Sequence, residues 1–464
     1  MSGQVYLNPS QLSILSIPRD KVWIFSSAIL KLLHQEAQNT PQSTFKSDAD
    51  RHYQSSDESS DTESETSDDS FQCDGEDVSK MTSSAFSDQS FSKRALLTKN
   101  TSRTDNSSKC GPAGSSSESL SDLANEAHHS DSSSSISGED HHFFHIAYTP
   151  SECTVIFPTQ SISQLFDEPL LVCEKLGYSD VILLGKSYLN LQVDSDGEFN
   201  NSAKILELTK PLSQHNISLF FLSTHFTNIV LIPYDLKDKV IDILSENDFI
   251  FSDFSNSYIS KRGFLDSTES LTVQYDESWK SHATTTTMKF LAETNIMPKI
   301  HRKVKLLLTG ARPGEVKQSI LKASQSIAAS AVPRYFSITR SSFSEISLIL
   351  PGSSKQRALM GFDFRSIIGS ASDVIIPIEV DLSKLPIDSA GIVAGLASSL
   401  LESVRFTDDP AAERFDMNYL SMARSAVVLI PQENLEVVTK MVNNMRDNLR
   451  NKDGELATAG VDLS

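Results

Sequence analysis

The sequence predicts an α+β protein made of four ferredoxin-like modules, arranged as two duplicated tandem pairs, with a long disordered insertion in the first module. Three observations predict this fold class. The chain contains an internal repeat, each repeat alternates between strand-like and helix-like hydrophobic periods, and an acidic, serine-rich segment interrupts the first repeat. The 464 residues leave room for two to four domains of ordinary size.

The internal repeat has the order A, B, A′, B′. The segment LSTHFTNIVLIPYDLKDKVIDIL begins at Leu222, and LSMARSAVVLIPQENLEVVTKMV begins at Leu420. A weaker pair precedes them, SECTVIFP from Ser151 and SEISLILP from Ser344. The offsets are 198 and 193 residues, so we interpret the repeat as duplication of a two-module unit.

The second module shows the alternation of periods. Pro233 ends a strand because proline cannot donate a ladder hydrogen bond, and Asp235 is the predicted N-cap of the next helix. In order, we predict a strand at 188–193, a helix at 203–215, strands at 217–222 and 228–232, a helix at 236–244 and a strand at 249–254. This β-α-β-β-α-β order is that of the ferredoxin-like fold.

The remaining modules follow the same order. In the fourth we predict a strand at 373–381, a helix at 391–403, strands at 418–423 and 426–430 and a helix at 433–446. In the first, a strand at 12–17 and a helix at 22–33 precede the insertion, and strands resume at 143–157. The predicted bounds are 1–36 with 143–170 for module 1, 37–142 for the insertion, 171–254 for module 2, 255–301 for a linker, 302–370 for module 3, 371–450 for module 4 and 451–464 for a flexible tail.

The insertion at 37–142 holds twenty acidic and eight basic residues, so it carries most of the formal net charge of −19. It has too few large apolar residues to offset the entropy of ordering, which predicts disorder. In its densest part, hydroxyls are followed within three positions by acids, as an acid-directed kinase prefers. The phosphorylation candidates are Ser55, Ser56, Ser59, Ser60, Thr62, Ser64 and Thr66. A phosphorylation-tunable arm and a plain solvated linker explain this segment equally well.

The composition excludes several partners. An acidic chain is repelled by nucleic acids and by anionic membranes, and no apolar run approaches the ~18 residues that span a bilayer. The chain shows no secretory signal, and its four cysteines show no metal-ligand spacing, which predicts a cytoplasmic location. Histidines at 128, 129, 141, 142 and 145 fit no rigid site, so neither a metal nor a cofactor is predicted.

Two strand-to-helix turns, at 309–314 and 386–392, are candidate anion sites. A glycine at a helix entry lets a ligand approach closely, and the first N–H groups of the helix favour a carboxylate. From the turn alone, an ordinary helix start capped by Asp388 is the better interpretation. The sequence contains no GxSxG, P-loop, GxGxxG or HExxH motif, which predicts a protein that is not an enzyme.

The modules and an Asp-x-x-Gly-Ile turn at 388–392 resemble ACT domains, which bind amino acids at module interfaces. More narrowly, the chain is similar to the CASTOR family of cytosolic arginine sensors that act upstream of the target-of-rapamycin kinase complex, as a divergent, fungal-style member. The segments that carry the resemblance are LSILSIPRDKVWIFSSAILKLL, NISLFFLSTHFTNIVLIPYDL, IDSAGIVAGLASSLLES and VVLIPQENLEVV.

The resemblance implies a ligand between modules 2 and 4. Ser218 and Leu219 match the contact in the second module, and Gly391 and Ile392 match the turn of the fourth, next to Asp388. The acidic contacts to a guanidinium do not match. The family's turn glutamate is Ser389 here, its later aspartate falls at Ala426, and a threonine–phenylalanine pair falls at Met422 and Ala423. Without these acids a buried guanidinium is uncompensated, so a less basic ligand, or none, is expected.

We therefore expect a non-enzymatic amino-acid sensor that modulates a GATOR-like complex in nutrient signalling. The alternative is a ligand-free scaffold whose modules and acidic arm hold a partner. An enzyme regulated by such modules needs a catalytic domain, for which no region remains. A homodimer is possible, although pairing within the chain can satisfy the same module surfaces.

Overall fold

The computed structural model describes residues 4–40, 143–194, 201–252, 291, 294, 296–405 and 415–443. They all belong to one compact unit, formed by residues 1–46 and 137–464, whereas a second unit at 47–136 lies outside them. The seven phosphorylation candidates, nearly all of the predicted insertion, most of the 255–301 linker and the 451–464 tail therefore lie outside the described residues.

The predicted ferredoxin-like modules are confirmed. Module 1 contains β1 (Gln4–Pro18), α1 (Val22–Gln38), β2 (Phe144–Tyr148), β3 (Glu152–Pro158), α2 (Asp167–Lys175) and β4 (Ile182–Leu183). Module 2 contains β5 (Tyr188–Asp194), α3 (Asn201–Gln214), β6 (Phe220–Ser223), β7 (Thr227–Pro233), α4 (Lys237–Glu246) and β8 (Ile250–Ser252).

The second half of the chain repeats this order. Module 3 contains β10 (Leu306–Ala311), α6 (Val316–Ala328), β11 (Phe336–Arg340), β12 (Ile346–Pro351), α7 (Ser354–Leu359) and β13 (Ile367–Ile368). Module 4 contains β14 (Ile375–Asp381), α8 (Ile392–Arg405), β15 (Asn418–Ser421), β16 (Ser425–Pro431) and a helix of which 435–443 is described. A short strand, β9 (Lys299–Ile300), precedes module 3 and pairs with β14.

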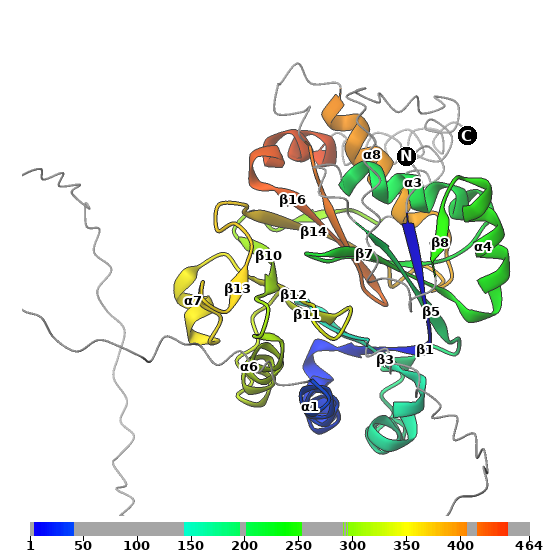
Figure 1. Ribbon diagram of the computed structural model, residues 1–464. Coiled ribbons are helices and arrows are strands. Elements are labelled where there is room, and N and C mark those ends of the chain that lie inside the picture. The colour runs from blue at the N-terminus through cyan, green and yellow to red at the C-terminus, as the bar shows by residue number, and fades with distance from the viewer. Residues whose placement is uncertain are drawn as a thin grey trace, which may run out of the picture. The chain divides into compact units, whose positions relative to one another are not determined.

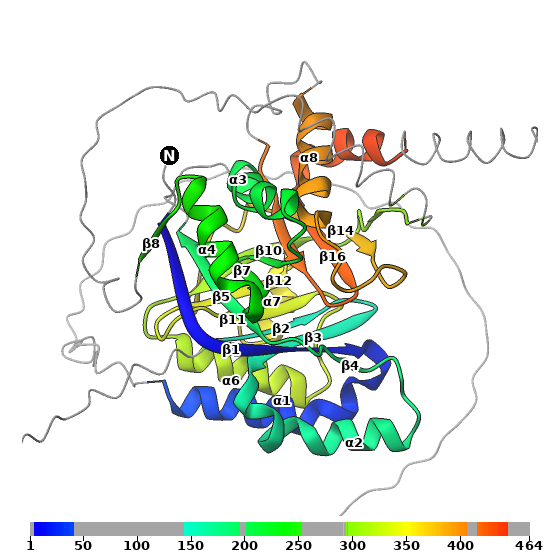
Figure 2. The same ribbon diagram turned by 90° about the vertical axis from the view of Figure 1, so that its right-hand side faces the viewer.

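The strands form one continuous 16-stranded sheet that folds into two layers, which we call the sheet of modules 1 and 3 and the sheet of modules 2 and 4, and β1 belongs to both. Its first residues lie between β5 and β8 of module 2, and its last seven pair with β3 of module 1. The register shifts between Asn8 and Leu12, around Pro9, which has no N–H to donate. Figure 2 shows β1 as a long ribbon that bends at this place. In the second half, β9 and β10 occupy the two corresponding positions, so the duplication includes this shared strand.

The modules pair through their edge strands, module 1 with module 3 and module 2 with module 4. Strand β2 pairs with β11 over five residues, whereas β6 meets β15 at one residue pair, Leu222 and Leu420. Within the described unit this gives four layers. Helices α1 and α6 form one outer layer, the two sheets form the inner layers, and α3, α4 and α8 form the other outer layer (Figure 1). These strand edges are thus occupied by pairing within the chain. This arrangement is the alternative to a homodimer that the sequence leaves open.

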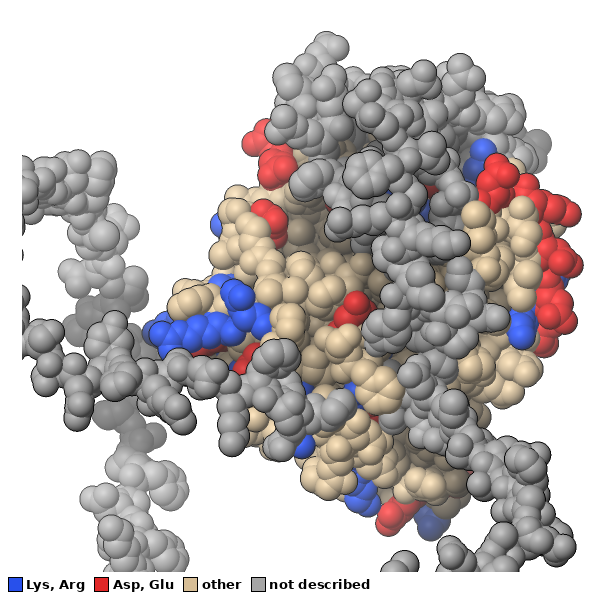
Figure 3. All heavy atoms as spheres, in the orientation of Figure 1, with Lys and Arg blue, Asp and Glu red and all other residues tan. Residues whose placement is uncertain are grey.

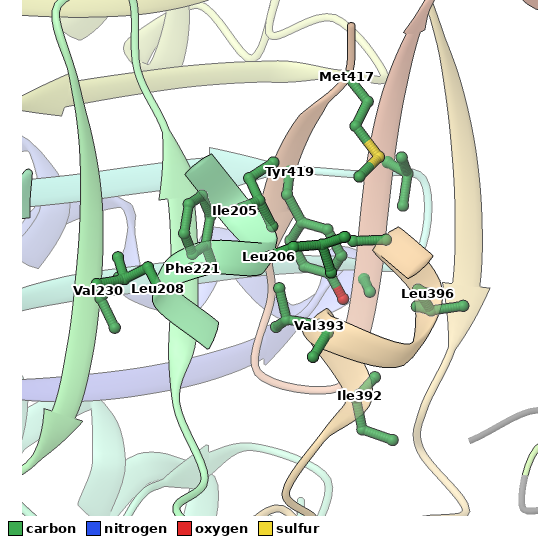
Figure 4. Packing of buried hydrophobic residues seen from close by; sticks show 14 of the residues in the cluster. Ile205, Leu206, Leu208, Phe221, Val230, Ile392, Val393, Leu396, Met417 and Tyr419 are labelled. Atoms are coloured by element: carbon green, nitrogen blue, oxygen red, sulfur yellow. The ribbon is translucent and has the colours of Figure 1, made fainter. Parts of the chain in front are cut away.

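Three hydrophobic cores separate the layers. One lies between α1 and α6 and the sheet of modules 1 and 3, and a second lies between the two sheets. The third packs α3, α4 and α8 on the sheet of modules 2 and 4. Figure 4 shows part of it, in which Phe221 and Tyr419 of the two edge strands lie beneath these helices. Their rings meet edge to face, with centroids 6.3 Å apart.

Several local predictions need correction. Helix α1 continues to Gln38, into the segment assigned to the insertion, because Ala37 is buried in the core of modules 1 and 3. Asp235 is not an N-cap. It lies in a 3₁₀ turn, and Leu236 precedes α4 without a side-chain cap. His145, in β2, is fully buried and hydrogen bonds to the hydroxyl of Thr339 on β11 at 2.7 Å, so it is a structural residue.

The visible surface is charged unevenly. Figure 3 shows acidic side chains gathered over α4, where Asp238, Asp242 and Glu246 are exposed at a spacing of one helical turn. Within the described ranges, no helix is long and apolar enough to cross a bilayer.

Candidate ligand-binding site

A cavity of about 210 Å³ lies where module 4 meets modules 1 and 2. Its wall comes from the turn between β14 and α8, the hairpin between β15 and β16, the start of β6 and β4. The lining residues are Ile182, Leu219, Phe220, Leu382, Ser383, Leu385, Pro386, Ile387, Ser389, Ile392, Val393, Tyr419, Ser421, Met422, Ala423, Arg424, Ser425 and Ala426. Apolar cavities of about 150 Å³ take up benzene, so this space fits a molecule of amino-acid size.

The turn before α8 is shaped by Ser389 and Gly391. The Ser389 hydroxyl donates to the Pro386 carbonyl at 2.7 Å, which leaves the turn compact. Gly391 has φ +81°, and a Cβ on it would lie 2.9 Å from the hydroxyl of Ser213 on α3. A side chain is therefore excluded there, and α3 and α8 approach closely at this glycine. Ile392 and Val393, the first residues of α8, line the cavity.

The hairpin that forms the other wall is held by module 1. Glu152, on β3, accepts hydrogen bonds from the Ser425 hydroxyl at 2.7 Å and from the Ser16 hydroxyl at 3.1 Å. Burial raises the pKa of this carboxyl, and these hydrogen bonds oppose that effect. The N–H of Ala423 donates to Thr154 of the same strand at 3.1 Å. The position of the cavity wall therefore depends on the pair formed by modules 1 and 3.

The duplicated hairpin of module 2 leaves less space. There His225 and Phe226 stand at the positions that Ala423 and Arg424 occupy in module 4, and the His225 N–H donates to Ser347 as that of Ala423 does to Thr154. A Cβ on Gly310 would collide with the ring of Phe226, so this glycine provides room for an aromatic ring of the protein itself. The space beside the predicted turn at 309–314 is therefore occupied by a side chain of the protein itself.

A second cavity, of about 440 Å³, adjoins the first at Arg424. Its four carboxyl groups already have partners. Glu152 is bound as above, Asp180 pairs with Lys21, Asp381 accepts from the N–H of Ser383, and Glu379 accepts from His301, Tyr335 and Ser151. The hydrogen bond from His301 holds the pKa of Glu379 below its usual value. Arg424 forms the wall between the two cavities.

The structure brings most of the predicted site residues together. Leu219, Ser389, Ile392, Met422, Ala423 and Ala426 line the cavity of about 210 Å³ between modules 2 and 4, and Gly391 lines a pocket of about 20 Å³ beside it. Ser218 and Asp388 line neither. The Asp388 carboxylate points away to Lys186, 3.5 Å from its Nζ, so Asp388 is not the cap of α8.

Sequence reasoning missed Tyr419, Arg424 and Glu152. Tyr419 and Arg424 lie within or next to the repeated segment that begins with Leu-Ser at Leu222 and Leu420, where the second copy departs from the first, and that departure was the available signal. Glu152 gives no such signal, because its role depends on a contact with a hairpin 272 and 273 residues later in the chain.

Comparison with known families bears on the two modules that flank the cavity. A family model described as ACT domain matches residues 184–246 and 370–444, which are modules 2 and 4. These two regions match ACT domains, so we refer to them as ACT modules 2 and 4. Modules 1 and 3 have the same βαββαβ order.

Solved structures give more distant likenesses. Aspartate kinase from Synechocystis is 9% identical with a TM-score of 0.24, and the match covers 66% of this chain and 50% of that one. The chain therefore spans half the length of that kinase. A protein of Agobacterium tumefaciens is 13% identical with a TM-score of 0.18, over 24% of this chain and 87% of that one. No curated protein matches the sequence.

Proposed function

We propose that this protein is a non-enzymatic, cytoplasmic regulatory protein that binds an amino acid or a related small molecule between ACT modules 2 and 4. The observation that carries the proposal is the cavity of about 210 Å³ at the start of α8, within the two regions that match the ACT domain model. Its size suits one amino acid and is too small for a nucleotide or coenzyme.

The lining supports binding rather than catalysis. Among the described residues that line the cavity, Tyr419 and Arg424 alone are ionisable, and neither exchanges a proton readily near neutral pH. Burial moves the pKa of Tyr419 further upward. General acid–base chemistry at this pH needs a histidine, a carboxyl, a lysine or a thiol in reach of the substrate.

The residues around the cavity also contact modules 1 and 2, so ligand binding can affect how the modules are arranged. The hairpin at 422–425 contacts module 1 through Glu152 and Thr154, and α8 contacts module 2 at Gly391. A ligand that prefers one arrangement of these contacts shifts the population towards it. The likeness to CASTOR proteins supports a role in nutrient signalling, through a GATOR-like complex upstream of the target-of-rapamycin kinase.

Thermal unfolding of the full chain with each of the twenty amino acids at millimolar concentration tests the proposal. A ligand that binds only the folded state adds about 2.7 kcal/mol at a hundredfold excess over its Kd. Ala426→Leu, which fills the cavity from a residue that is 1% exposed, should abolish the shift. Ala331→Leu, at an exposed site, is the matched control and should keep it.

Two outcomes count against the proposal. A shift that survives Ala426→Leu would place the ligand elsewhere, and no shift with any amino acid would favour the scaffold. In cells, phosphorylation by the target-of-rapamycin kinase should respond to the ligand with the wild-type chain and with Ala331→Leu, but not with Ala426→Leu.

A further inference from the structure

Arg424 is the one positively charged residue among the described residues that line the cavity between ACT modules 2 and 4, and it also lines the second cavity with its four carboxyl groups. None of the described residues that line this cavity is aspartate or glutamate. The nearby acids are engaged elsewhere, since Glu152 is bound by Ser16 and Ser425 and Asp180 pairs with Lys21. Among the described residues, no side chain or carbonyl accepts a hydrogen bond from the Arg424 guanidinium.

The other described arginines that are partly or fully buried, and the exposed Arg312, behave differently, whereas the exposed Arg302, Arg334 and Arg365 also form no guanidinium hydrogen bond with a described residue. Arg19 donates to the carbonyls of Val332 and Pro333, Arg312 to that of Phe364, Arg357 to those of Pro351 and Gly352, and Arg340 to Glu36. A guanidinium is a fixed fork of donors that matches a carboxylate in a bidentate arrangement. The half-buried Arg424, which lines both cavities, therefore has its guanidinium donors available for a ligand.

A second polar group in the cavity also has no partner from the described part of the chain. The Tyr419 side chain is 1% exposed, and its hydroxyl makes no hydrogen bond to a described residue. Figure 4 shows the ring beneath α3 and α8, with its oxygen towards Val393, which lines the cavity. The hydroxyl of this otherwise buried side chain can therefore donate a hydrogen bond to a polar atom of a ligand or accept one from it.

The rest of the lining is mainly apolar. Between the two polar groups lie aliphatic and aromatic side chains from the β14–α8 turn, the hairpin and the start of β6, among them Leu219, Phe220, Leu382, Ile392 and Met422. An aliphatic body gains roughly 0.8 kcal/mol for each CH₂ that it buries here. A cationic side chain would lose its hydration and meet Arg424 with no acid to compensate it.

We infer that the ligand of this site is a small apolar carboxylate, such as an aliphatic amino acid or its 2-oxo acid, whose acid group pairs with Arg424 and whose α-substituent hydrogen bonds to Tyr419. This inference rests on the proposed function and specifies the ligand class of the same site. It excludes arginine and lysine as ligands.

Calorimetric titration of the full chain with five probes tests it. The probes are L-leucine, 4-methyl-2-oxopentanoate, 4-methylpentanoate, L-leucinamide and L-arginine. Leucine or its 2-oxo acid should bind, and whichever is tighter identifies the natural α-substituent. The amide should bind at least tenfold more weakly than leucine, because it lacks the carboxylate, and arginine should not bind.

Two variants assign the contacts. Arg424→Gln should weaken binding of the carboxylate probes at least tenfold and leave binding of the amide unchanged. Arg302→Gln, at an exposed arginine, should change the binding of neither. Tyr419→Phe keeps the ring and should weaken binding of leucine or its 2-oxo acid three- to tenfold. Binding of 4-methylpentanoate, which has no α-substituent, should not change.

The outcomes separate the inference from the proposed function. Equal binding of leucine and leucinamide, or no effect of Arg424→Gln on a ligand that Ala426→Leu abolishes, would overturn the inference and leave the amino-acid site in place. Tight binding of arginine would do the same. Failure of all five probes together with all twenty amino acids would instead remove the proposed function.

Discussion

The two module pairs of this protein have the same topology but different interfaces. Modules 1 and 3 join through five residue pairs of β2 and β11, and a buried ion pair between Arg340 and Glu36 lies at that interface. Modules 2 and 4 meet at the single pair Leu222–Leu420, flanked by hydrogen bonds from backbone N–H groups to serine hydroxyls, and a cavity lies beside it. Duplication has thus produced one closed pair, filled by its own side chains, and one pair with room for a ligand.

The largest effect should come from breaking the closed pair. Arg340→Met removes the hydrogen bond of 2.7 Å from the guanidinium to the buried carboxylate of Glu36, and we expect a loss of about 3–5 kcal/mol in the free energy of unfolding. Urea unfolding followed by circular dichroism measures it. The double variant Arg340→Met with Glu36→Leu should recover much of the loss, since both charges of the pair are then removed. A single-variant loss below about 1 kcal/mol would show that this interface does not depend on the ion pair.

A pH dependence should follow from His145 of the same interface. Burial lowers the pKa of His145 to about 3, whereas the unfolded chain titrates near ~6.5. The contribution of neutral, buried His145 to the free energy of unfolding is complete above the pKa that the histidine has in the unfolded chain. This contribution is lost as the pH falls towards 3. Between pH 7 and pH 5 this amounts to about 2 kcal/mol.

His145→Asn, which retains a partner for Thr339, should flatten this pH dependence. Urea midpoints at the two pH values give the measurement. Burial raises the pKa values of Glu152 and Asp416, which acts in the opposite direction, so the difference between variant and wild type isolates the histidine. Equal slopes for the two proteins would contradict the assignment.

A smaller effect is expected where modules 2 and 4 meet. Ser421 accepts a hydrogen bond from the N–H of Phe221 at 2.8 Å, and Ser223 accepts one from that of Tyr419 at 3.0 Å. Ser223→Ala leaves a buried N–H unpaired and should cost about 1 kcal/mol, with a similar value for Ser421→Ala. Hydrogen exchange should show faster opening of β6 and β15 with β2 and β11 unchanged. Equal acceleration in both pairs would mean that the interfaces open together.

The smallest effect should come from the exposed ion pair of Lys186 and Asp388. Their side chains are 49% and 63% exposed, so Lys186→Met should change the free energy of unfolding by less than about 0.5 kcal/mol. Ligand binding should also be unaffected, since neither residue lines the cavity. A large effect on affinity would show that the β14–α8 turn is positioned by this pair.

The sequence predicted elements whose signal is local. The repeat from Leu222 and Leu420 predicted the equivalent strands and helices, and Pro233 marks the end of β7 as expected. The first part of β1 was missed, since the predicted strand covered only 12–17 and the pairing of residues 4–8 with module 2 depends on long-range partners. The edge strand β9 was missed for the same reason, since two residues carry no periodicity.

For the site, the turn at 386–392 and the positions of Met422, Ala423 and Ala426 were predictable from the resemblance. Their arrangement around one cavity depends on the close approach of α3 to Gly391 and on the anchoring of the hairpin by Glu152. These contacts join residues from three modules, and no pattern in the sequence encodes such distances. The lack of an acceptor for the Arg424 guanidinium among the described residues likewise becomes clear only when each neighbouring acid has been assigned its hydrogen-bond partners.

The shared strand β1 has a consequence for how the chain reaches its native state. Gln4, Val5 and Tyr6 can pair with their neighbours in β8 only after module 2 has been synthesised, so a segment made first is completed late. Such non-local pairing raises contact order and slows folding. A single module expressed alone would either lack this edge or carry it unpaired, and unpaired edges promote association between chains. The first half taken whole would complete β1 but still expose β2 and β6, whose partners β11 and β15 lie in the second half, so clean folding should require both halves together.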